Sequence, residues 1–589
     1  MFQALRKSKS FSSESRNIKH RRRISNLILW IILTVLIVDS IYTSESQGQG
    51  QVLKVEIRVT NDRIGEIDPK IYGHFIEHLG RCIYGGIWVG ENSKIPNLRG
   101  LRLDVLNAVK AISPPIIRWP GGCFADGYHW KDGIGPKNKR PVRPNPAWGG
   151  IESNQFGTDE FIDFCREVGA EAYITVNVGS GSPQEAAEWV EYCNGDLNTT
   201  YGRLRAEYGH TEPYGVKYWG IGNELYGSWE IGHMDADTYA RKVIEFAEAM
   251  RKVDSSIKII AVGWFWGGSE GEYWNRKVLE VAGDHIDYLS LHTYCWKPGY
   301  TDYFAIVNYP INVEYELKKT VNLINSVLKN KPGKQIKIAL DEWGVWYENA
   351  TDGLSQSVRL CDGLMAAGMF HVFHRLCNNV TIANFAQLVN ALPAIVTSDR
   401  GEMYVNPIYL AFKLYRHNTG KIALKTLTKG VSINILDVSA TIDEEGNFLY
   451  LAVINKDPDR MANATIILKD FKPKSVCKES QLNGPDIFSK NDFKSPDVVK
   501  ITTKYVTLNV SNGVFTYAFE PHSVTILTLE NINSTVPLTS EFEETTPSTT
   551  SPTTGETPVF QEMSLIIAGA IILIALTIFL IIRVRKPLL

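Results

Sequence analysis

Residues 216–262 read VKYWGIGNELYGSWEIGHMDADTYARKVIEFAEAMRKVDSSIKIIAV. A β-rich run, Val216–Ile221, is followed by a polar loop and then by helical periodicity over Asp235–Lys252, which opens with the capping residues Asp-Ala-Asp. A second β-rich run, Ile257–Val262, ends the segment. The segment therefore predicts a strand–helix–strand unit, the repeat from which parallel sheets and (β/α)8 barrels are built.

The same alternation extends in both directions from this unit. Helices are also predicted at Thr158–Val168, which opens with Thr-Asp-Glu, and at Ser182–Cys193, which opens with Ser-Pro. The β-rich runs are Ile71–Ile76, Pro115–Trp119, Ala172–Val178, Val216–Ile221, Ile257–Val262, Ile286–Leu291, Ile336–Leu340 and Val380–Phe385. This pattern predicts a (β/α)8 barrel over residues 66–416, with a doubly wound parallel sheet as the alternative.

After His417 the pattern changes to short strands with turns between them and little helix. The predicted strands are Val431–Ile435, Phe448–Val453, Ala464–Leu468, Val506–Val510, Phe515–Phe519 and Val524–Leu529. They predict a C-terminal all-β sandwich, jelly-roll-like, over residues 417–532. The alternating segment at 50–65 is expected to add a strand to this sandwich, because chain ends often lie close together.

The N-terminal segment, residues 1–45, begins with many basic residues, the last of which are Arg21-Arg22-Arg23. An uncharged run, Ile24–Val38, follows them and is short for a membrane span. This order predicts either a cleaved signal peptide or a signal anchor.

The C-terminal segment predicts a membrane anchor. Residues 533–562 are rich in Thr, Ser and Pro and predict an extended stalk, and 563–582 are uncharged and long enough to cross a bilayer. The basic residues of 583–589 then predict a cytoplasmic tail. Several Asn-x-Ser/Thr sequons also suit an exported glycoprotein, so we expect a cell-surface protein whose folded body lies outside the cytoplasm.

Composition narrows the function classes. Lys and Arg total 62 and Asp and Glu total 64, a formal net charge of -2, which argues against a nucleic-acid-binding protein. The eight cysteines include no Cys-x-x-Cys pair, so a zinc ribbon and a thioredoxin-like site have no support.

Two carboxylates stand at the ends of predicted barrel strands. Glu224 follows the fourth strand in Gly222-Asn-Glu224, and Glu342 follows the seventh in Asp341-Glu-Trp343. Catalytic residues of such barrels lie at the carboxyl ends of strands, so both side chains can face one pocket. Paired carboxylates perform glycoside hydrolysis, and Arg118 and Tyr294 are natural partners for keeping one of them ionised.

Six segments also resemble glycoside hydrolase family 51, the α-L-arabinofuranosidases of clan A. They are GHFIEHLGRCIYGGIWVG (from Gly73), IRWPGGCFADGYHWKDGIGP (from Ile117), YWGIGNELYG (from Tyr218), LSLHTY (from Leu289), ALDEWGVWY (from Ala339) and ANFAQLVN (from Ala383). A weaker match, EPHSVTILTL from Glu520, is similar to the end of the family's C-terminal sandwich.

The resemblance implies a retaining, exo-acting α-L-arabinofuranosidase in which Glu224 is the general acid/base and Glu342 the nucleophile. It assigns binding of the terminal sugar to four residues: Glu77, Arg118, Asn223 and Gln387. It places Tyr294 on the nucleophile and Trp346 near the sugar. Cys123 stands where some members have Asn, so it is expected to line the pocket or to form one end of a disulfide.

The resemblance further implies an arabinose-containing glycan as substrate, no metal and no organic cofactor, and a homo-oligomer, since relatives are often oligomeric. An endo-glycanase on the same scaffold and a non-catalytic surface glycan-binding protein are the alternatives. The string His74-Phe-Ile-Glu-His78 fits a zinc-peptidase pattern, but that pattern needs a helix and this run lies in a strand-like setting, which argues against zinc. The motif Trp264-Phe-Trp266 is either a sugar platform or core.

Overall fold

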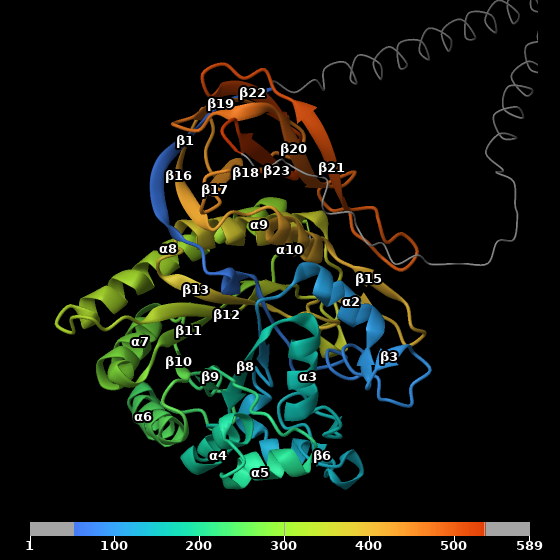
Figure 1. Cartoon of the computed structure of the whole chain (residues 1–589), viewed down its shortest axis with the longest axis vertical. Coiled ribbons are helices and arrows are strands. Elements are labelled where there is room, and N and C mark those ends of the chain that lie inside the picture. Colours follow the sequence, from blue (N-terminus) through green and yellow to red (C-terminus); the bar gives the residue numbers. More distant parts are fainter. Residues whose placement is uncertain (1–51, 300, 535, 537–589) are drawn as a thin grey trace, which may run out of the picture. The chain divides into compact units, whose positions relative to one another are not determined.

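The computed structural model describes residues 52–299, 301–534 and 536, and its central feature is a closed barrel of parallel strands (Figure 1). Around the barrel the order is β10-β11-β12-β13-β2-β5-β8-β9. These strands are β2 (Gly73–Phe75), β5 (Ile116–Trp119), β8 (Glu171–Val176), β9 (Tyr218–Ile221), β10 (Lys258–Val262), β11 (Tyr288–Trp296), β12 (Lys337–Trp346) and β13 (Val380–Ala386). Each predicted β-rich run overlaps one of them, so the predicted barrel is confirmed and the doubly wound alternative is wrong.

Helices cover the outside of the barrel (Figure 1). They are α2 (Leu103–Ile112), α3 (Thr158–Val168), α4 (Pro183–Asn194), α5 (Thr200–Glu207), α6 (Ala236–Val253), α7 (Gly268–Ala282), α8 (Tyr303–Leu328), α9 (Leu360–Arg375) and α10 (Pro407–His417). Helix α6 begins after Asp235 because its carboxylate accepts a hydrogen bond from the backbone N–H of Thr238 at 2.9 Å. Its buried stripe, Tyr239, Val243, Phe246 and Met250, has the spacing of one helix face.

The barrel interior changes from apolar to polar along the strands. An apolar layer is formed by Ile116, Tyr173, Tyr218, Ile260, Ala339 and Ile382. Because side chains alternate along a strand, Arg118 faces the same interior two residues beyond Ile116. The carboxyl ends of the strands therefore carry the polar groups, above a packed apolar floor.

The C-terminal strands form one nine-stranded sheet in the order β21-β20-β23-β18-β17-β16-β1-β19-β22. They are β1 (Leu53–Glu66), β16 (Ile422–Lys429), β17 (Leu436–Ile442), β18 (Phe448–Asn455), β19 (Ala462–Leu468), β20 (Pro473–Asn483), β21 (Lys500–Thr507), β22 (Val514–Phe519) and β23 (Ser523–Asn531). One core joins Ile57 of β1, Leu451 of β18 and Phe519 of β22, so distant parts of the sheet face each other as in a sandwich. Strand β1 runs antiparallel to β16 and parallel to β19.

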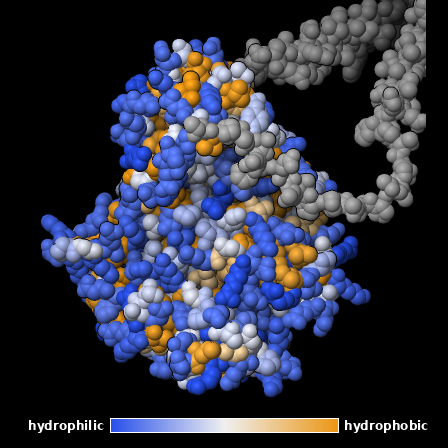
Figure 2. Space-filling model, in the orientation of Figure 1, coloured by the Kyte–Doolittle hydropathy of each residue, from blue (hydrophilic) through white to orange (hydrophobic). Residues whose placement is uncertain are grey.

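One predicted strand of the sandwich is wrong. Val431–Ile435 is a turn, in which the N–H of Ile435 donates to the carbonyl of Ser432 at 3.0 Å, and β17 begins only at Leu436. Short two-stranded ribbons lie in the loops: β3 (Asn97–Leu98) with β4 (Leu101–Arg102), β6 (Arg143–Pro144) with β7 (Ile151–Glu152), and β14 (Ile395–Thr397) with β15 (Met403–Val405). The viewed surface of the molecule is mostly hydrophilic, with scattered hydrophobic patches (Figure 2).

Buried polar contacts join α9 to the sheet. Arg375 of α9 donates to Asp437 of β17 at 2.8 Å, and His371 Nδ1 lies 3.2 Å from the same carboxylate. His374 lies 2.9 Å from Ser439 Oγ. Burial opposes ionisation of Asp437, but Arg375 and His371 hold its pKa well below the usual range.

Replacing Asp437 with alanine is expected to lower the free energy of unfolding by about 3–5 kcal/mol, because it removes one partner of a buried ion pair. Urea denaturation of the whole chain measures this change. The matched control is Asp459→Ala on the exposed surface, expected to change stability by about 0.5 kcal/mol or less. Equal stabilities of the two variants would contradict a role for Asp437 in holding barrel and sheet together.

One part of the predicted fold class is corrected. No helix within residues 52–299 and 301–534 is both long and apolar enough to cross a membrane. The longest of these helices, α8, carries four charged residues, Glu314, Glu316, Lys318 and Lys319. The predicted span at 563–582 lies outside the described residues, as do the segments at 1–45 and 583–589 and most of the stalk at 533–562. The described residues are therefore assigned as a barrel with a β-sandwich.

Candidate active site

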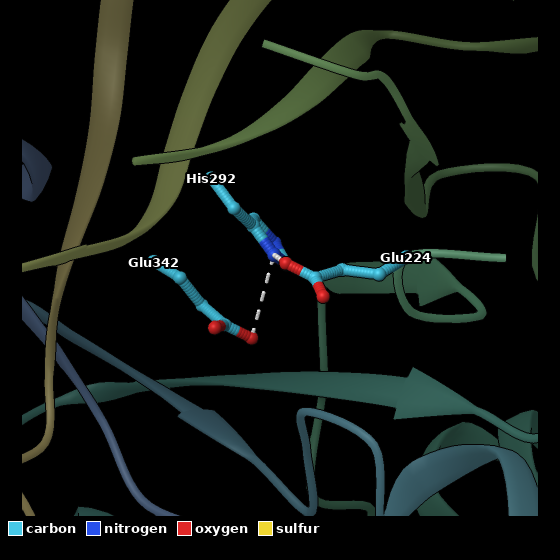
Figure 3. Close-up of side chains that lie close together, drawn as sticks. All are labelled: Glu224, His292 and Glu342. Carbon is cyan, nitrogen blue, oxygen red and sulfur yellow. Dashed lines mark hydrogen bonds and ion pairs between the residues drawn. The ribbon is translucent and has the colours of Figure 1, made fainter. Parts of the chain in front are cut away.

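The two predicted carboxylates converge at the mouth of the barrel. Glu224 lies in the loop after β9, Glu342 lies within β12, and both point toward His292 of β11 (Figure 3). His292 Nδ1 is 2.8 Å from Glu224 Oε1 and 3.6 Å from Glu342 Oε1. One oxygen of each carboxylate and this nitrogen all lie within 4.8 Å of one another. This arrangement allows the carboxyl groups of Glu224 and Glu342 to act together on one small group bound between them.

An extra residue in β12 aims two consecutive carboxylates at the same site. Ser290 pairs with Ala339 and His292 with Glu342, so β12 advances three residues where β11 advances two. On the other side, β12 again has one more residue than β13 between Leu340 and Trp343. Such a bulge breaks the alternation of side chains and re-aims them. Asp341 and Glu342 consequently both reach Arg118.

Glu342 is held by donors from two other strands. Arg118 Nη1 donates to Glu342 Oε1 at 2.6 Å, and the Tyr294 hydroxyl donates to Oε2 at 2.7 Å. Asp341 lies 3.6 Å from Arg118 Nε and accepts from the Tyr173 hydroxyl at 2.6 Å. Charge-assisted hydrogen bonds from a buried guanidinium stabilise a carboxylate in its ionised form.

Glu224 has a different set of partners. His292 lies on its Oε1, and the indole N–H of Trp229 donates to Oε2 at 3.0 Å. Burial opposes ionisation of Glu224, but the hydrogen bond and charge of His292 outweigh it and lower the pKa. Burial alone would lower the pKa of His292, whereas the charge of Glu342 and hydrogen bonds to Asp341 and Glu224 raise it to about 10. At rest, the proton shared by this pair therefore lies on His292.

Asn223 and Arg118, two predicted sugar-binding residues, are bonded to each other. Arg118 Nη2 donates to Asn223 Oδ1 at 2.8 Å, and both side chains are buried. The backbone N–H of Asn223 donates to Asp126 at 2.8 Å. These bonds fix the residue that immediately precedes Glu224.

Glu77 and Gln387, the other two, form one wall of the site. Gln387 Nε2 donates to Glu77 at 3.1 Å, and Glu77 also accepts from the Trp148 indole at 2.8 Å and the Phe124 backbone at 3.0 Å. Burial, together with the charge of Glu342, raises the pKa of Glu77 to about 7. A Cβ on Gly122 would lie 2.7 Å from a Glu77 oxygen, so glycine in the Pro-Gly-Gly turn leaves room for this carboxylate.

The remaining two predicted residues lie near this cluster. The ring of Trp346, the last residue of β12, lies 5.7 Å from that of Tyr294. Cys123 is half-buried and beside Glu230, and burial raises the pKa of its thiol. All eight cysteines are free, so the expected alternative of a disulfide at Cys123 is wrong.

Sequence reasoning did not assign four residues that touch the site: His292, Asp341, Trp148 and Trp229. The first two stand beside predicted site residues, in Leu291-His-Thr-Tyr294 and Leu340-Asp-Glu342, so strand-end position is a signal that could have found them. No such signal exists for Trp148, which lies in the loop between β6 and β7.

The zinc-peptidase string does not form a ligand set. His74 packs on Phe412 with ring centres 4.3 Å apart, whereas His78 pairs with Glu152 at 2.7 Å. Glu224, His292 and Glu342 could hold a metal by distance alone. The Arg118 guanidinium on Glu342 and the raised pKa of His292 disfavour a cation there.

Exposed indoles stand near the mouth. Trp229 is 62% exposed although it hydrogen-bonds Glu224, and Trp266 after β10 is 46% exposed. Trp264 instead stacks on Tyr226 with ring centres 4.7 Å apart. The motif Trp264-Phe-Trp266 is therefore divided between packing and an exposed aromatic face of the kind that sugars stack on.

Known families match both parts of the chain. The model described as alpha-L-arabinofuranosidase 1 domain matches residues 108–309, and the alpha-L-arabinofuranosidase C-terminal domain matches 341–523. The intracellular exo-alpha-L-arabinofuranosidase of Bacteroides ovatus is 35% identical over 522 residues, which cover 84% of this chain and 99% of that protein.

Solved structures agree with these matches. An alpha-L-arabinofuranosidase from Thermotoga maritima in an arabinose complex has 41% identity and a TM-score of 0.74, covering 81% of this chain and 100% of its own. The thermostable GH51 alpha-L-arabinofuranosidase from Thermotoga petrophila gives the same identity, TM-score and coverage.

The predicted location is corrected by these findings. The Bacteroides ovatus relative is named as intracellular, and no helix among the described residues could serve as the predicted anchor. A signal segment and glycosylation have no support in the comparisons either, so no membrane location is assigned. On the strength of these family models, this relative and these solved structures, the chain belongs to the α-L-arabinofuranosidases of glycoside hydrolase family 51.

Proposed function

We propose that this protein is a retaining, exo-acting α-L-arabinofuranosidase, which removes terminal non-reducing α-L-arabinofuranosyl residues from arabinose-containing glycans. The observation that carries the proposal is the approach of Glu224 and Glu342, whose nearest oxygens lie within 4.8 Å. Retaining glycosidases hold their two carboxyls about 5–5.5 Å apart, whereas inverting enzymes need about 6.5–9.5 Å to admit a water molecule. The short separation supports a double displacement.

Glu342 is the proposed nucleophile because Arg118 and Tyr294 both donate hydrogen bonds to its carboxyl group and hold it in place. One of its oxygens attacks the anomeric carbon, the bond from that carbon to the leaving oxygen breaks, and the leaving oxygen takes a proton from Glu224. In the second step Glu224 removes a proton from water, and the water oxygen displaces Glu342 from the sugar.

The proton for the first step is held on the His292–Glu224 pair. The charge of Glu342 is the largest of the effects that raise the pKa of His292. When Glu342 bonds to the sugar it loses that charge, so His292 holds its proton less strongly. The pair therefore releases a proton through Glu224 as the leaving oxygen departs, and regains it when water attacks.

Exo action is supported by the wall behind the two carboxylates. Gln387 and Trp148 both donate hydrogen bonds to Glu77 there. We expect this wall to confine the site to one terminal sugar, bound by Glu77, Gln387, Arg118 and Asn223, with Trp346 near it. Exposed indoles such as Trp229 would then meet the rest of the glycan.

We also propose the domain division expected from the sequence: a catalytic barrel over 66–416 and a β-sandwich over 417–532, completed by the strand at 50–65. The pairing of β1 with β16 and β19 supports it.

The experiment is hydrolysis of a panel of p-nitrophenyl glycosides, with proton NMR of the product trapped in methanol. We expect turnover of the α-L-arabinofuranoside and a methyl glycoside of retained configuration. An inverted product, a ladder of oligosaccharides from internal cleavage, or glycan binding without turnover would each contradict the proposal.

A further inference from the structure

We infer that Glu230 is a positioning residue whose carboxyl group, in its neutral form, orients Asn223 and through it the Arg118–Glu342 pair. This inference rests on the proposed function, since its consequences for turnover are measured with an arabinofuranoside.

Glu230 belongs to the same loop as Glu224, and this loop folds back so that Glu230 contacts Asn223. The N–H of Gly227 donates to the carbonyl of Glu224 at 2.7 Å, and the N–H of Glu230 donates to the carbonyl of Gly227 at 3.1 Å. These two turns bring Glu230 back toward Asn223, where it is only 5% exposed. A glutamate buried to this degree needs a reason, because charged side chains are almost never fully buried without partners.

Three hydrogen bonds connect Glu230 to the nucleophile. Asn223 Nδ2 donates to Glu230 Oε1 at 2.8 Å. Asn223 Oδ1 accepts from Arg118 Nη2 at 2.8 Å, and Arg118 Nη1 donates to Glu342 at 2.6 Å. Arg118 and Glu230 together orient the Asn223 amide, because Arg118 can only donate and so faces the amide oxygen, while Glu230 accepts from the amide nitrogen.

The same residue holds the backbone from which Glu224 projects. Asn223 lies between Gly222 at φ 75° and Glu224 at φ 34°, two left-handed conformations, of which the second is uncommon for a residue other than glycine. Its backbone N–H is held by Asp126 and its side chain by Glu230 and Arg118. Loosening Asn223 would therefore disturb both carboxyls of the reaction.

The surroundings of Glu230 favour its neutral form. The titratable groups that face it are Asp126 and Cys123 from the loop after β5 and Glu224 from its own loop. Arg118, the cation that the hydrogen bonds through Asn223 connect to Glu230, donates to Glu342 and Asn223 and not to Glu230. Among the described residues, Glu230 Oε2 makes no close hydrogen bond, and the Cys123 thiol beside this carboxyl is only a weak donor. A buried carboxylate that faces other acids is costly, whereas the carbonyl oxygen of a neutral acid still accepts the Asn223 bond.

Burial, reinforced by the charge of Asp126, raises the pKa of Glu230 to about 8. A neutral Glu230 adds no further negative charge to a site in which Arg118 and His292 already lie against Glu224, Asp341 and Glu342. Ionisation of Glu230 at higher pH would add a negative charge beside Asn223 and draw its amide away from Arg118.

The test compares Glu230→Gln and Glu230→Ala with the wild-type chain between pH 5 and 10. Glutamine is neutral at every pH and still accepts from Asn223, so at pH 6 its kcat should be close to that of wild type. Alanine removes the acceptor, and kcat should fall by about 10- to 100-fold, because small misplacements of catalytic groups have effects of this size. The ratio of kcat for Glu230→Gln to that of wild type should rise with a midpoint near pH 8, since titrations common to both proteins cancel.

A second readout does not depend on activity. Unfolded Glu230 loses its proton near the ordinary pKa of 4.5, but the folded protein keeps it up to about 8. Wild type therefore loses stability relative to Glu230→Gln as pH rises through this interval. The melting temperature of Glu230→Gln minus that of wild type should increase with pH. The matched control is Glu248→Gln on the exposed face of α6, for which neither readout should change with pH.

A glutamine variant as impaired as alanine, or a melting-temperature difference that is constant with pH, would overturn the inference. An alanine variant as active as wild type would also overturn it. Failure of the proposed function would be seen separately, as absence of turnover in the wild type while the melting temperatures still separate.

Discussion

Glu342→Ala is expected to lower turnover of an aryl α-L-arabinofuranoside by about 10⁴-fold or more, because loss of a covalent nucleophile removes the whole double displacement. Its neighbours Arg118 and Tyr294 stay in place, so the remaining pocket still binds the sugar. The measurement is kcat with p-nitrophenyl α-L-arabinofuranoside, with circular dichroism to confirm that the variant is folded.

Chemical rescue makes this prediction specific. In Glu342→Ala, azide can enter the space of the missing carboxylate and attack the anomeric carbon once, giving an arabinosyl azide of inverted configuration. The control is Glu348→Gln, an exposed residue just beyond β12, which should retain wild-type turnover. Near-normal turnover of Glu342→Ala, or an azide product of retained configuration, would contradict the assignment of the nucleophile.

Glu224→Ala is expected to affect substrates according to their leaving group. On an arabinose-containing oligosaccharide, whose leaving oxygen needs a proton, turnover should fall by about 10²–10⁴-fold, the usual contribution of general acid–base catalysis. On a 2,4-dinitrophenyl arabinofuranoside the first step needs little protonation, so the glycosyl-enzyme should form quickly and then accumulate. A burst of dinitrophenol followed by a slow steady state measures this directly.

In Glu224→Ala, azide is expected to give the stereochemistry opposite to that in Glu342→Ala. It needs no general base, so it should attack the accumulated glycosyl-enzyme, raise the steady-state rate and give an azide of retained configuration. The exposed Glu212→Gln variant serves as the control. An equal loss of activity on both substrates, with no effect of azide, would contradict an acid/base role for Glu224.

The sequence predicted the barrel and the convergence of the main carboxylates because both depend on local patterns. Strand runs such as Val216–Ile221 alternate with capped helices, and the end of a parallel barrel strand always faces the same mouth. Position after a strand was therefore enough to bring Glu224, Glu342, Arg118 and Tyr294 together. Their catalytic and binding roles stay predictions until the variants are measured.

What could not be predicted depends on departures from local pattern. The extra residue in β12 cannot be seen in the periodicity of Ala339–Trp343, yet it turns Asp341 and Glu342 to the same side. Glu230 and Trp148 reach the site only because loops return to it, and loop paths have no sequence period. In the sandwich, the alternation of Val431, Ile433 and Ile435 is typical of a strand, but Ile433 is exposed and the chain turns there.

The place of β1 has a consequence for how the chain is made. Its partners β16 and β19 begin more than 350 residues later, at Ile422 and Ala462, so the first described strand must wait through synthesis of the entire barrel before it can be paired. Such a distant pairing is slow to form, because the closure entropy of a very long loop precedes any gain from contacts. A C-terminal fragment released without its N-terminal strand would present two open sheet edges and invite self-association. The sandwich therefore draws its strands from both sides of the barrel sequence, and its first strand is synthesised before the barrel but paired only after it.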